Sequence, residues 1–197
     1  MDRQHLLNQY ATDMAALTGH IREAVEHQRD TVDFDAYPQL SPTLDRIIAT
    51  MDRQQKALEG YNDNTEGGGL LETAKEAFLG ILGEAAGLID RLRQTDRVSR
   101  MVRDDYTALS LAAVSYHMLH TTALGLKDAR LADLAVKHLG EITPVLVELS
   151  KVVSVVVVRE LNEEDRIIDA SVADEAIANT QKMWNPEHTD QSASVTA

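Results

Sequence analysis

The sequence predicts an all-α protein built around one bundle of long helices. Apolar residues recur at steps of three and four through most of the 197 residues, which is the period of an amphipathic helix. A sustained apolar-polar alternation, which would indicate half-buried strands, does not occur between turn residues. The length suits one domain with a substantial core. We expect a bundle domain over residues 1–160, a peripheral helix over 161–184 and a disordered tail over 185–197.

The first helix is predicted over residues 3–30 and the second from Ser41-Pro42 to the stretch GYNDNTEGGG, which starts at Gly60. Serine can accept hydrogen bonds from free amides at a helix start, proline suits the first helical position, and glycines and asparagines disfavour continuation. The expected core face of the first helix is Leu7, Tyr10, Met14, Leu17, Ile21 and Val25. That of the second is Leu44, Ile47 or Ile48, Met51, Gln55 and Leu58.

A third helix is predicted over 70–94, and its glycines Gly80, Gly83 and Gly87 are expected to allow close packing. A fourth helix is predicted over 98–125, with Asp96 or Ser99 as its cap. This helix is apolar on nearly all sides from Leu109 to Leu119, so we expect it at the centre of the bundle.

The fifth helix is predicted over 129–160, antiparallel to the fourth because only a short turn separates them. Pro144 removes one backbone hydrogen bond, which predicts a kink near 140–144. The valine run VVSVVVV favours a strand by propensity, but the apolar seam of the helix continues through it. The expected inward residues of the peripheral helix are Ile167, Ile168, Val172, Ile177 and Trp184.

Composition narrows the function classes. The chain has no cysteine, which removes disulfides and thiolate metal sites, and we expect it in the cytoplasm. A formal charge of −13 repels phosphate backbones, so nucleic acid is not an expected partner. The longest apolar run is far shorter than the about 20 residues of a membrane span, so no membrane association is expected.

Polar side chains on the core faces are the candidates for chemistry. Counted from the turn near residue 127, His138 lies about 16 Å along the fifth helix, the level of Tyr116 on the fourth. The sequence therefore predicts a contact in which this phenol and imidazole satisfy each other. His120 is expected to point inward, and His117 to lie on a neighbouring face.

Further carboxylates and histidines lie on the other helices. On the first helix, Asp13, His20 and His27 recur every seven residues, with Glu23 one turn beyond His20; a solvated flank is the favoured interpretation. The adjacent residues Asp104 and Asp105 diverge around the helix, and we expect them in capping or in solvent. Phosphate-loop, esterase and zinc-protease motifs do not occur, and no catalytic residue is assigned.

The segments VRDDYTALSLAAVSYHMLHTTALGL and LADLAVKHLGEITPVLVELS resemble the last two core helices of the ferritin-like superfamily. They are most similar to its small stress-associated bacterial branch of unassigned activity. The resemblance implies a ferritin-like four-helix bundle with additional helices. It also implies a di-metal site, with a glutamate on each of two helices and Glu-x-x-His on each of the others.

The sequence departs from that ligand pattern. It contains no Glu-x-x-His; Ser115 and Met118 stand at carboxylate positions of the fourth helix, and His138 with Glu141 reverses the order of the motif. Asp52 and Gln55 stand at the motif's place on the second helix, where a neutral amide is a weak ligand. The di-metal ligand set therefore looks lost.

Two functional hypotheses follow. The first is a non-catalytic bundle without a bound cofactor, which acts in a bacterial stress context through self-association, with a homodimer favoured, or through a protein partner. The alternative is a divergent metal-binding, redox or storage protein that holds iron or another divalent transition metal. The candidate ligands for this alternative are His20, Glu23, His120, His138 and Glu141.

Overall fold

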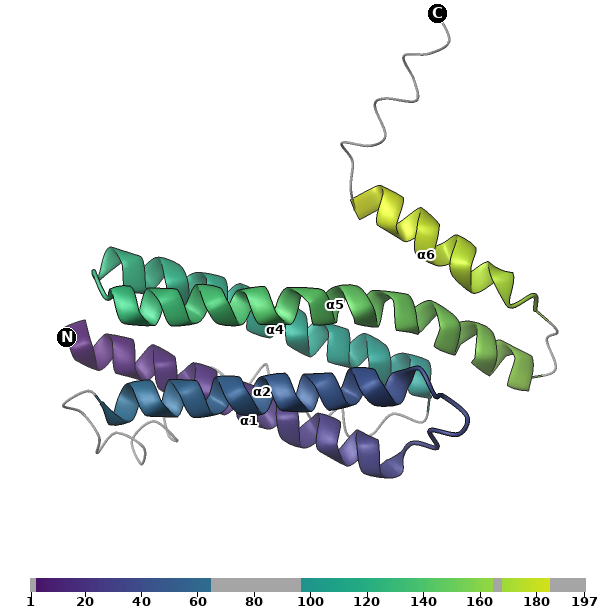
Figure 1. The fold of residues 1–197 in the computed structure, drawn as a ribbon, viewed down its shortest axis with the longest axis horizontal. Coiled ribbons are helices and arrows are strands. Elements are labelled where there is room, and N and C mark those ends of the chain that lie inside the picture. The colour runs from purple at the N-terminus through teal and green to yellow at the C-terminus, as the bar shows by residue number, and fades with distance from the viewer. Residues whose placement is uncertain (1–2, 65–96, 165–167, 185–197) are drawn as a thin grey trace, which may run out of the picture.

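A computed structural model describes residues 3–64, 97–164 and 168–184, and every regular element in these ranges is an α-helix. This confirms the all-α prediction. The helices are α1 (Arg3–Thr31), α2 (Leu40–Asp63), α4 (Val98–Gly125), α5 (Ala129–Glu163) and α6 (Ser171–Trp184) (Figure 1). The helix predicted over 70–94, the tail 185–197 and Ile167 lie outside the described residues. None of the described helices is both long and apolar enough to cross a bilayer.

The four longest of these helices pack as two antiparallel hairpins, α1 with α2 and α4 with α5, and α1 also packs on α4 and α2 on α5 (Figure 1). At one end of the bundle, the hydroxyl of Tyr61 donates to Asp128 at the α4–α5 turn, at 2.9 Å. At the other end, the hydroxyl of Tyr37 donates to Glu163, at 3.3 Å. The last residue of α2 and the first residue of α4 therefore lie at opposite ends, and α2 and α4 run in the same direction.

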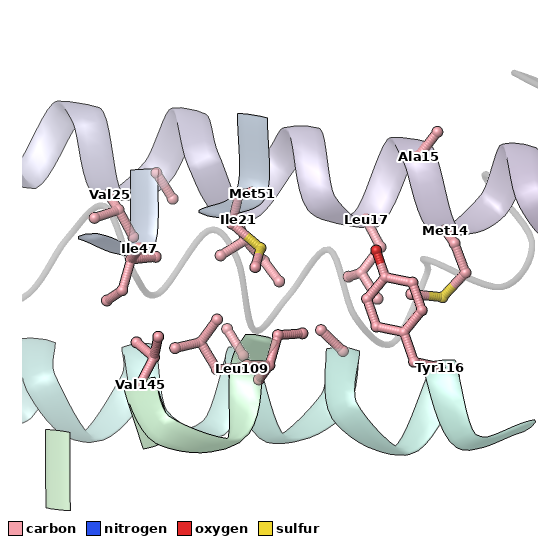
Figure 2. Packing of buried hydrophobic residues seen from close by; sticks show 14 of the residues in the cluster. Met14, Ala15, Leu17, Ile21, Val25, Ile47, Met51, Leu109, Tyr116 and Val145 are labelled. Carbon is pink, nitrogen blue, oxygen red and sulfur yellow. The ribbon is translucent and has the colours of Figure 1, made fainter. Parts of the chain in front are cut away.

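The core lies between the two hairpins and is mostly hydrocarbon (Figure 2). Five of the six residues expected on the first helix are buried, and Tyr10 packs against the core while partly exposed. On α5 the seam expected from the sequence is also buried, except that Leu134 is partly exposed; it consists of Leu131, Leu134, His138, Ile142, Val145, Leu149, Val152 and Val156. The valine run is helical, because α5 extends to Glu163, and Pro144 lies inside this single helix. The kink stays a prediction.

Leu109 lies at the centre of this core and is 1% exposed (Figure 2). Replacing it with alanine is expected to lower the free energy of unfolding by about 2–5 kcal/mol, since the substitution removes buried methyl groups and leaves a cavity. Leu124 lies on the same helix but is 57% exposed, and its replacement with alanine should change stability little. Urea unfolding of both variants measures the difference. Equal losses from the two would contradict the packing described here.

Tertiary contacts, rather than the expected capping residues, set the ends of α2 and α4. α2 begins at Leu40 with Ser41 already inside it, and Gln39 at its cap makes no side-chain hydrogen bond, so the predicted Ser41 cap is wrong. α2 also continues past Gly60, because Tyr61 is buried against the neighbouring helices. At the start of α4, the carboxylate of Glu160 on α5 accepts from the backbone N–H and the hydroxyl of Ser99, at 2.9 and 2.5 Å.

The pattern of buried residues on α2 and on α4 differs from what the sequence predicted. On α2 the buried amide is Gln54, whereas Gln55 is partly exposed, because the buried row runs through Met51, Gln54 and Leu58. α4 is not enclosed at the centre of the bundle. Its outer face is open to solvent, with Val114 54% and Leu124 57% exposed.

The peripheral helix α6 packs on α5 through a narrow face. Its one fully buried residue is Ala173, whereas Val172 and Trp184 are exposed, so the prediction that they face inward is wrong. The Trp184 ring instead stacks on Tyr106 of α4, with ring centroids 6.5 Å apart. A helix that touches only one surface needs few inward side chains, which explains why its apolar residues are not all covered.

Candidate functional site

A polar layer crosses the bundle near the middle of α2 and in the first half of α5. The rings of Tyr116 on α4 and His138 on α5 meet edge to face, with centroids 5.1 Å apart and planes at 79°. This confirms the predicted contact. On the α2 side, the amide nitrogen of Gln54 donates to the backbone carbonyl of His138 and to the carboxylate of Glu141, both at 3.1 Å. Residues from three helices therefore meet in this layer.

The polar atoms of this layer are incompletely satisfied. Tyr116 Oη, His138 Nδ1 and Gln54 Oε1 are buried and have no hydrogen-bond partner among the described residues. The prediction that the phenol and the imidazole satisfy each other is therefore wrong, because the two rings touch without a hydrogen bond at these atoms. Buried polar groups without partners are rare in folded proteins and carry a desolvation cost.

Burial also decides the protonation of the two rings. It lowers the pKa of His138 to about 4, although the nearby Glu141 carboxylate works in the opposite direction. It raises the pKa of Tyr116 well above its usual range, and Glu141 adds to that rise. Both rings are therefore neutral at pH 7. A neutral imidazole has a lone pair that could accept a proton or bind a metal.

Replacing Tyr116 with phenylalanine is expected to leave stability unchanged or to raise it by about 1–2 kcal/mol, because it removes a buried hydroxyl without a partner. The same change at Tyr61 should destabilise the protein, since the Tyr61 hydroxyl accepts from Gln4 and donates to Asp128. Thermal unfolding followed by circular dichroism compares the two variants. A clear loss of stability in Tyr116→Phe would show that its hydroxyl has a partner in solution.

A second polar pair lies nearer the other end of the bundle. The amide nitrogen of Gln28 on α1 donates to Asp105 Oδ1 on α4, at 2.9 Å, and Asp105 Oδ2 has no partner among the described residues. Asp105 is 1% exposed, and burial raises its pKa to about 8; the Gln28 bond lowers the pKa and the charge of Asp104 raises it further. The carboxyl of Asp105 is therefore mostly protonated at pH 7.

The expectation that Asp104 and Asp105 serve in capping or face solvent is wrong. Both are buried, and Asp104 is paired with the Arg103 guanidinium at 2.6 Å. The sequence contained a signal for Asp105, because it precedes Leu109 by four positions and Ala112 by seven, and so lies on the core stripe. Asp104 and Asp105 point in different directions around α4, but both are buried because neighbouring parts of the protein cover a wide arc of this helix.

The five predicted metal ligands are only partly brought together. His138 and Glu141 belong to the same polar layer, linked through Gln54. His120 does not enter the four-helix core as expected; it is partly exposed, and its Nδ1 lies 2.8 Å from the carbonyl oxygen of Ala132 on α5. On α1, His20 is partly exposed and Glu23 is exposed.

The donor chemistry of the described core does not fit a di-metal site of the ferritin-like type. Such a site needs several carboxylates and histidines facing one another. The polar layer supplies one imidazole and one carboxylate, and the surrounding core positions carry hydrocarbon (Figure 2). Across residues 3–64, 97–164 and 168–184, no group of three or more His, Asp or Glu side chains could hold a metal ion. We derive no chemistry through such a pair of metals.

The outer face of the α4–α5 hairpin is the second notable surface. From Tyr106 to Leu126 the sequence contains no charged residue, although the chain as a whole has a formal charge of −13. Large apolar side chains are exposed on both helices of the hairpin. On α4 they are Val114, Met118 and Leu124, and on α5 Val136, Val147 and Val157. Exposed apolar side chains that gather on one surface commonly mark a binding surface.

The fold and these two features describe an all-α bundle with a polar layer inside and exposed apolar side chains on the outside of the α4–α5 hairpin. Comparison with known proteins adds no relative, since no family model, no curated protein and no solved structure matches this chain.

Proposed function

We propose that the protein is a non-catalytic bundle of the ferritin-like arrangement that acts through association, first with a second copy of itself. The helix order supports the ferritin-like part of the proposal. α2 and α4 run in the same direction, and their consecutive ends lie at opposite ends of the bundle, as in ferritin-like folds with one long crossover.

The interior supports the non-catalytic part of the proposal. In the polar layer the groups are neutral at pH 7, apart from the Glu141 carboxylate, which accepts from Gln54. Of the two buried aspartates of α4, Asp105 is mostly protonated at that pH, and Asp104 is paired with Arg103. Two divalent ions in a dry core would need several anionic ligands to offset their charge. We extend the proposal to a cytoplasmic role in a bacterial stress response, the context that the family resemblance implies.

The single observation that carries the proposal is the run of α4 without a charged residue, from Tyr106 to Leu126, together with the exposed apolar side chains of the α4–α5 hairpin on a strongly acidic chain. Size-exclusion chromatography with light scattering tests it over a range of protein concentrations. We expect the mass to approach that of a dimer as the concentration rises. A monomer at every concentration would contradict the proposal, and stoichiometric bound iron in that monomer would favour the second function described next.

One observation favours a second function, a single transition-metal site. His138 Nδ1 is buried without a partner among the described residues, and Glu141 belongs to the same layer. Elemental analysis of protein purified without chelators tests this function. Iron, manganese and zinc all far below one equivalent, together with no acceleration of ferrous iron oxidation, would rule it out. If a metal is bound at this layer, His138→Leu should abolish its retention.

A further inference from the structure

We infer that two copies of the chain pack through the outer face of the α4–α5 hairpin, on the half next to the α4–α5 turn, about a two-fold axis near His117 and Val136. This inference rests on the proposed function and names the surface that would carry it. The surface, called here the hairpin face, consists of Ser110, Val114, His117, Thr121 and Leu124 of α4 with Val136, Leu139, Thr143 and Leu146 of α5.

Helical spacing and observed contacts put these residues on one side of the hairpin. The α4 row continues at steps of three and four from Tyr106, whose ring contacts Trp184 of α6. α6 itself packs on α5, so this row faces the outer side that α4 shares with α5. In an antiparallel hairpin with its turn near residue 127, Met118 and Val136 lie at the same level. The two rows therefore run side by side.

The net negative charge of the chain favours a second copy of the same chain as the partner that binds the hairpin face. A chain with a formal charge of −13 repels its own copy over most of its surface. The nine residues of the hairpin face are uncharged, with the exposed Asp133 and Lys137 of α5 at its edge, and a two-fold axis through it brings two surfaces with few charges together. An acidic chain can therefore approach its copy closely here. A basic partner would instead be expected to bind an acidic surface.

The protein already uses the other half of the hairpin to bind a helix. α6 lies along the half of α5 that ends at Glu163 (Figure 1). It is held by buried Ala173 and by the stacking of Trp184 on Tyr106. The half next to the turn also exposes apolar side chains, such as Val114 at 54%, and no described helix covers it. A helix hairpin of a second copy would cover it.

The size of the hairpin face sets the expected strength of the dimer. The row from Ser110 to Leu124 is about 22 Å long at 1.5 Å per residue, and two helices 8–10 Å apart give a strip about 20 Å wide. The flat area is roughly 400 Å² per copy, below the about 800 Å² per partner of standard interfaces. Exposed Trp184, whose ring stacks on Tyr106 at the end of the α4 row, can add contacts. We therefore expect a weak dimer that forms only at high protein concentration.

Charge insertion tests the surface. Val114→Glu and Val136→Glu should each raise the dimer dissociation constant at least about 100-fold, because the two-fold axis would bury two unpaired carboxylates. Val172→Glu is the matched control, since this valine is 43% exposed on α6 and away from the hairpin face. It should dimerise like the wild type. Circular dichroism of each variant verifies that the helices remain folded.

Disulfide trapping tests the position of the axis. The chain has no cysteine, so a single introduced cysteine can form a disulfide only with a second copy. His117→Cys should cross-link readily under mild oxidation, and Val172→Cys should not. If the wild type is a dimer but Val114→Glu and Val136→Glu dimerise normally, the hairpin face is not the interface, while self-association itself stands. A wild type that stays monomeric contradicts both proposals.

Discussion

Replacing Asp105 with asparagine is expected to raise the free energy of unfolding at pH 7 by a few kcal/mol. The folded protein holds this carboxyl protonated, with a pKa of about 8, because it is fully buried. In the unfolded chain the same carboxyl ionises near pH 4, so between about pH 4 and 8 folding requires proton uptake. Within that window, each rise of one pH unit lowers the free energy of unfolding by about 1.4 kcal/mol. Asparagine removes this dependence and keeps the oxygen that accepts from Gln28.

Chemical denaturation of Asp105→Asn at several pH values between 6.5 and 8 measures this effect. The wild type should lose stability as the pH rises through this range, and the variant should not. Asp133→Asn, which changes an exposed carboxyl on α5, is the control and should follow the wild type. Equal slopes for wild type and Asp105→Asn would mean that the Asp105 carboxyl is ionised in the folded state.

Replacing His138 with leucine is expected to protect the protein against acid. Burial lowers the pKa of His138 to about 4 in the folded state, whereas an unfolded histidine has a pKa of about 6.5. The neutral ring thus contributes stability above pH 6.5, and this contribution is lost as the pH falls toward 4, at up to about 1.4 kcal/mol per unit. At pH 7 the change itself should be mild, because leucine also removes a buried nitrogen without a partner.

Unfolding of His138→Leu between pH 4 and 7 checks this expectation. The control is His27→Leu, which makes the same change at an exposed position of α1 and should leave the acid response unaltered. If the stability of His138→Leu changes with pH between 4 and 7 in the same way as that of the wild type, then the buried His138 imidazole makes no contribution to the acid response and this expectation is wrong.

The contributions of Asp105 and His138 to the pH dependence of stability have opposite signs, so the two variants can be combined in one test. Between pH 4 and 6.5, Asp105 lowers stability with rising pH while His138 raises it, so their contributions largely cancel in the wild type. Above pH 6.5 only the Asp105 contribution remains. Asp105→Asn should therefore reveal the pH dependence due to His138, and His138→Leu that due to Asp105. In the double variant the free energy of unfolding should change little with pH.

The helices and their core faces could be predicted because they depend on local spacing. Residues three and four apart share a helix face, so the stripe on α1 and the seam on α5 followed from the order of apolar residues alone. The level of His138 opposite Tyr116 followed from the rise per residue and the short α4–α5 turn. These are properties of one helix or one hairpin.

Side chains that depend on a distant helix could not be predicted in the same way. The choice of Gln54 over Gln55 needed the rotation of α2 against α5, where the Gln54 amide reaches His138 and Glu141. The N–H groups at the start of α4 meet Glu160, which lies 61 positions further along the chain from Ser99. The burial of Asp105 required α1 to supply Gln28, 77 positions earlier.

The sequence by itself therefore determined that this chain forms long amphipathic helices, that α4 and α5 are antiparallel, and that its chemistry excludes thiolates. Only the tertiary structure decided which polar groups are buried without partners, which carboxyl is protonated and which apolar residues stay exposed. The physical reason is that periodicity fixes the face of a residue on its own helix, whereas burial depends on what the neighbouring helices place against that face.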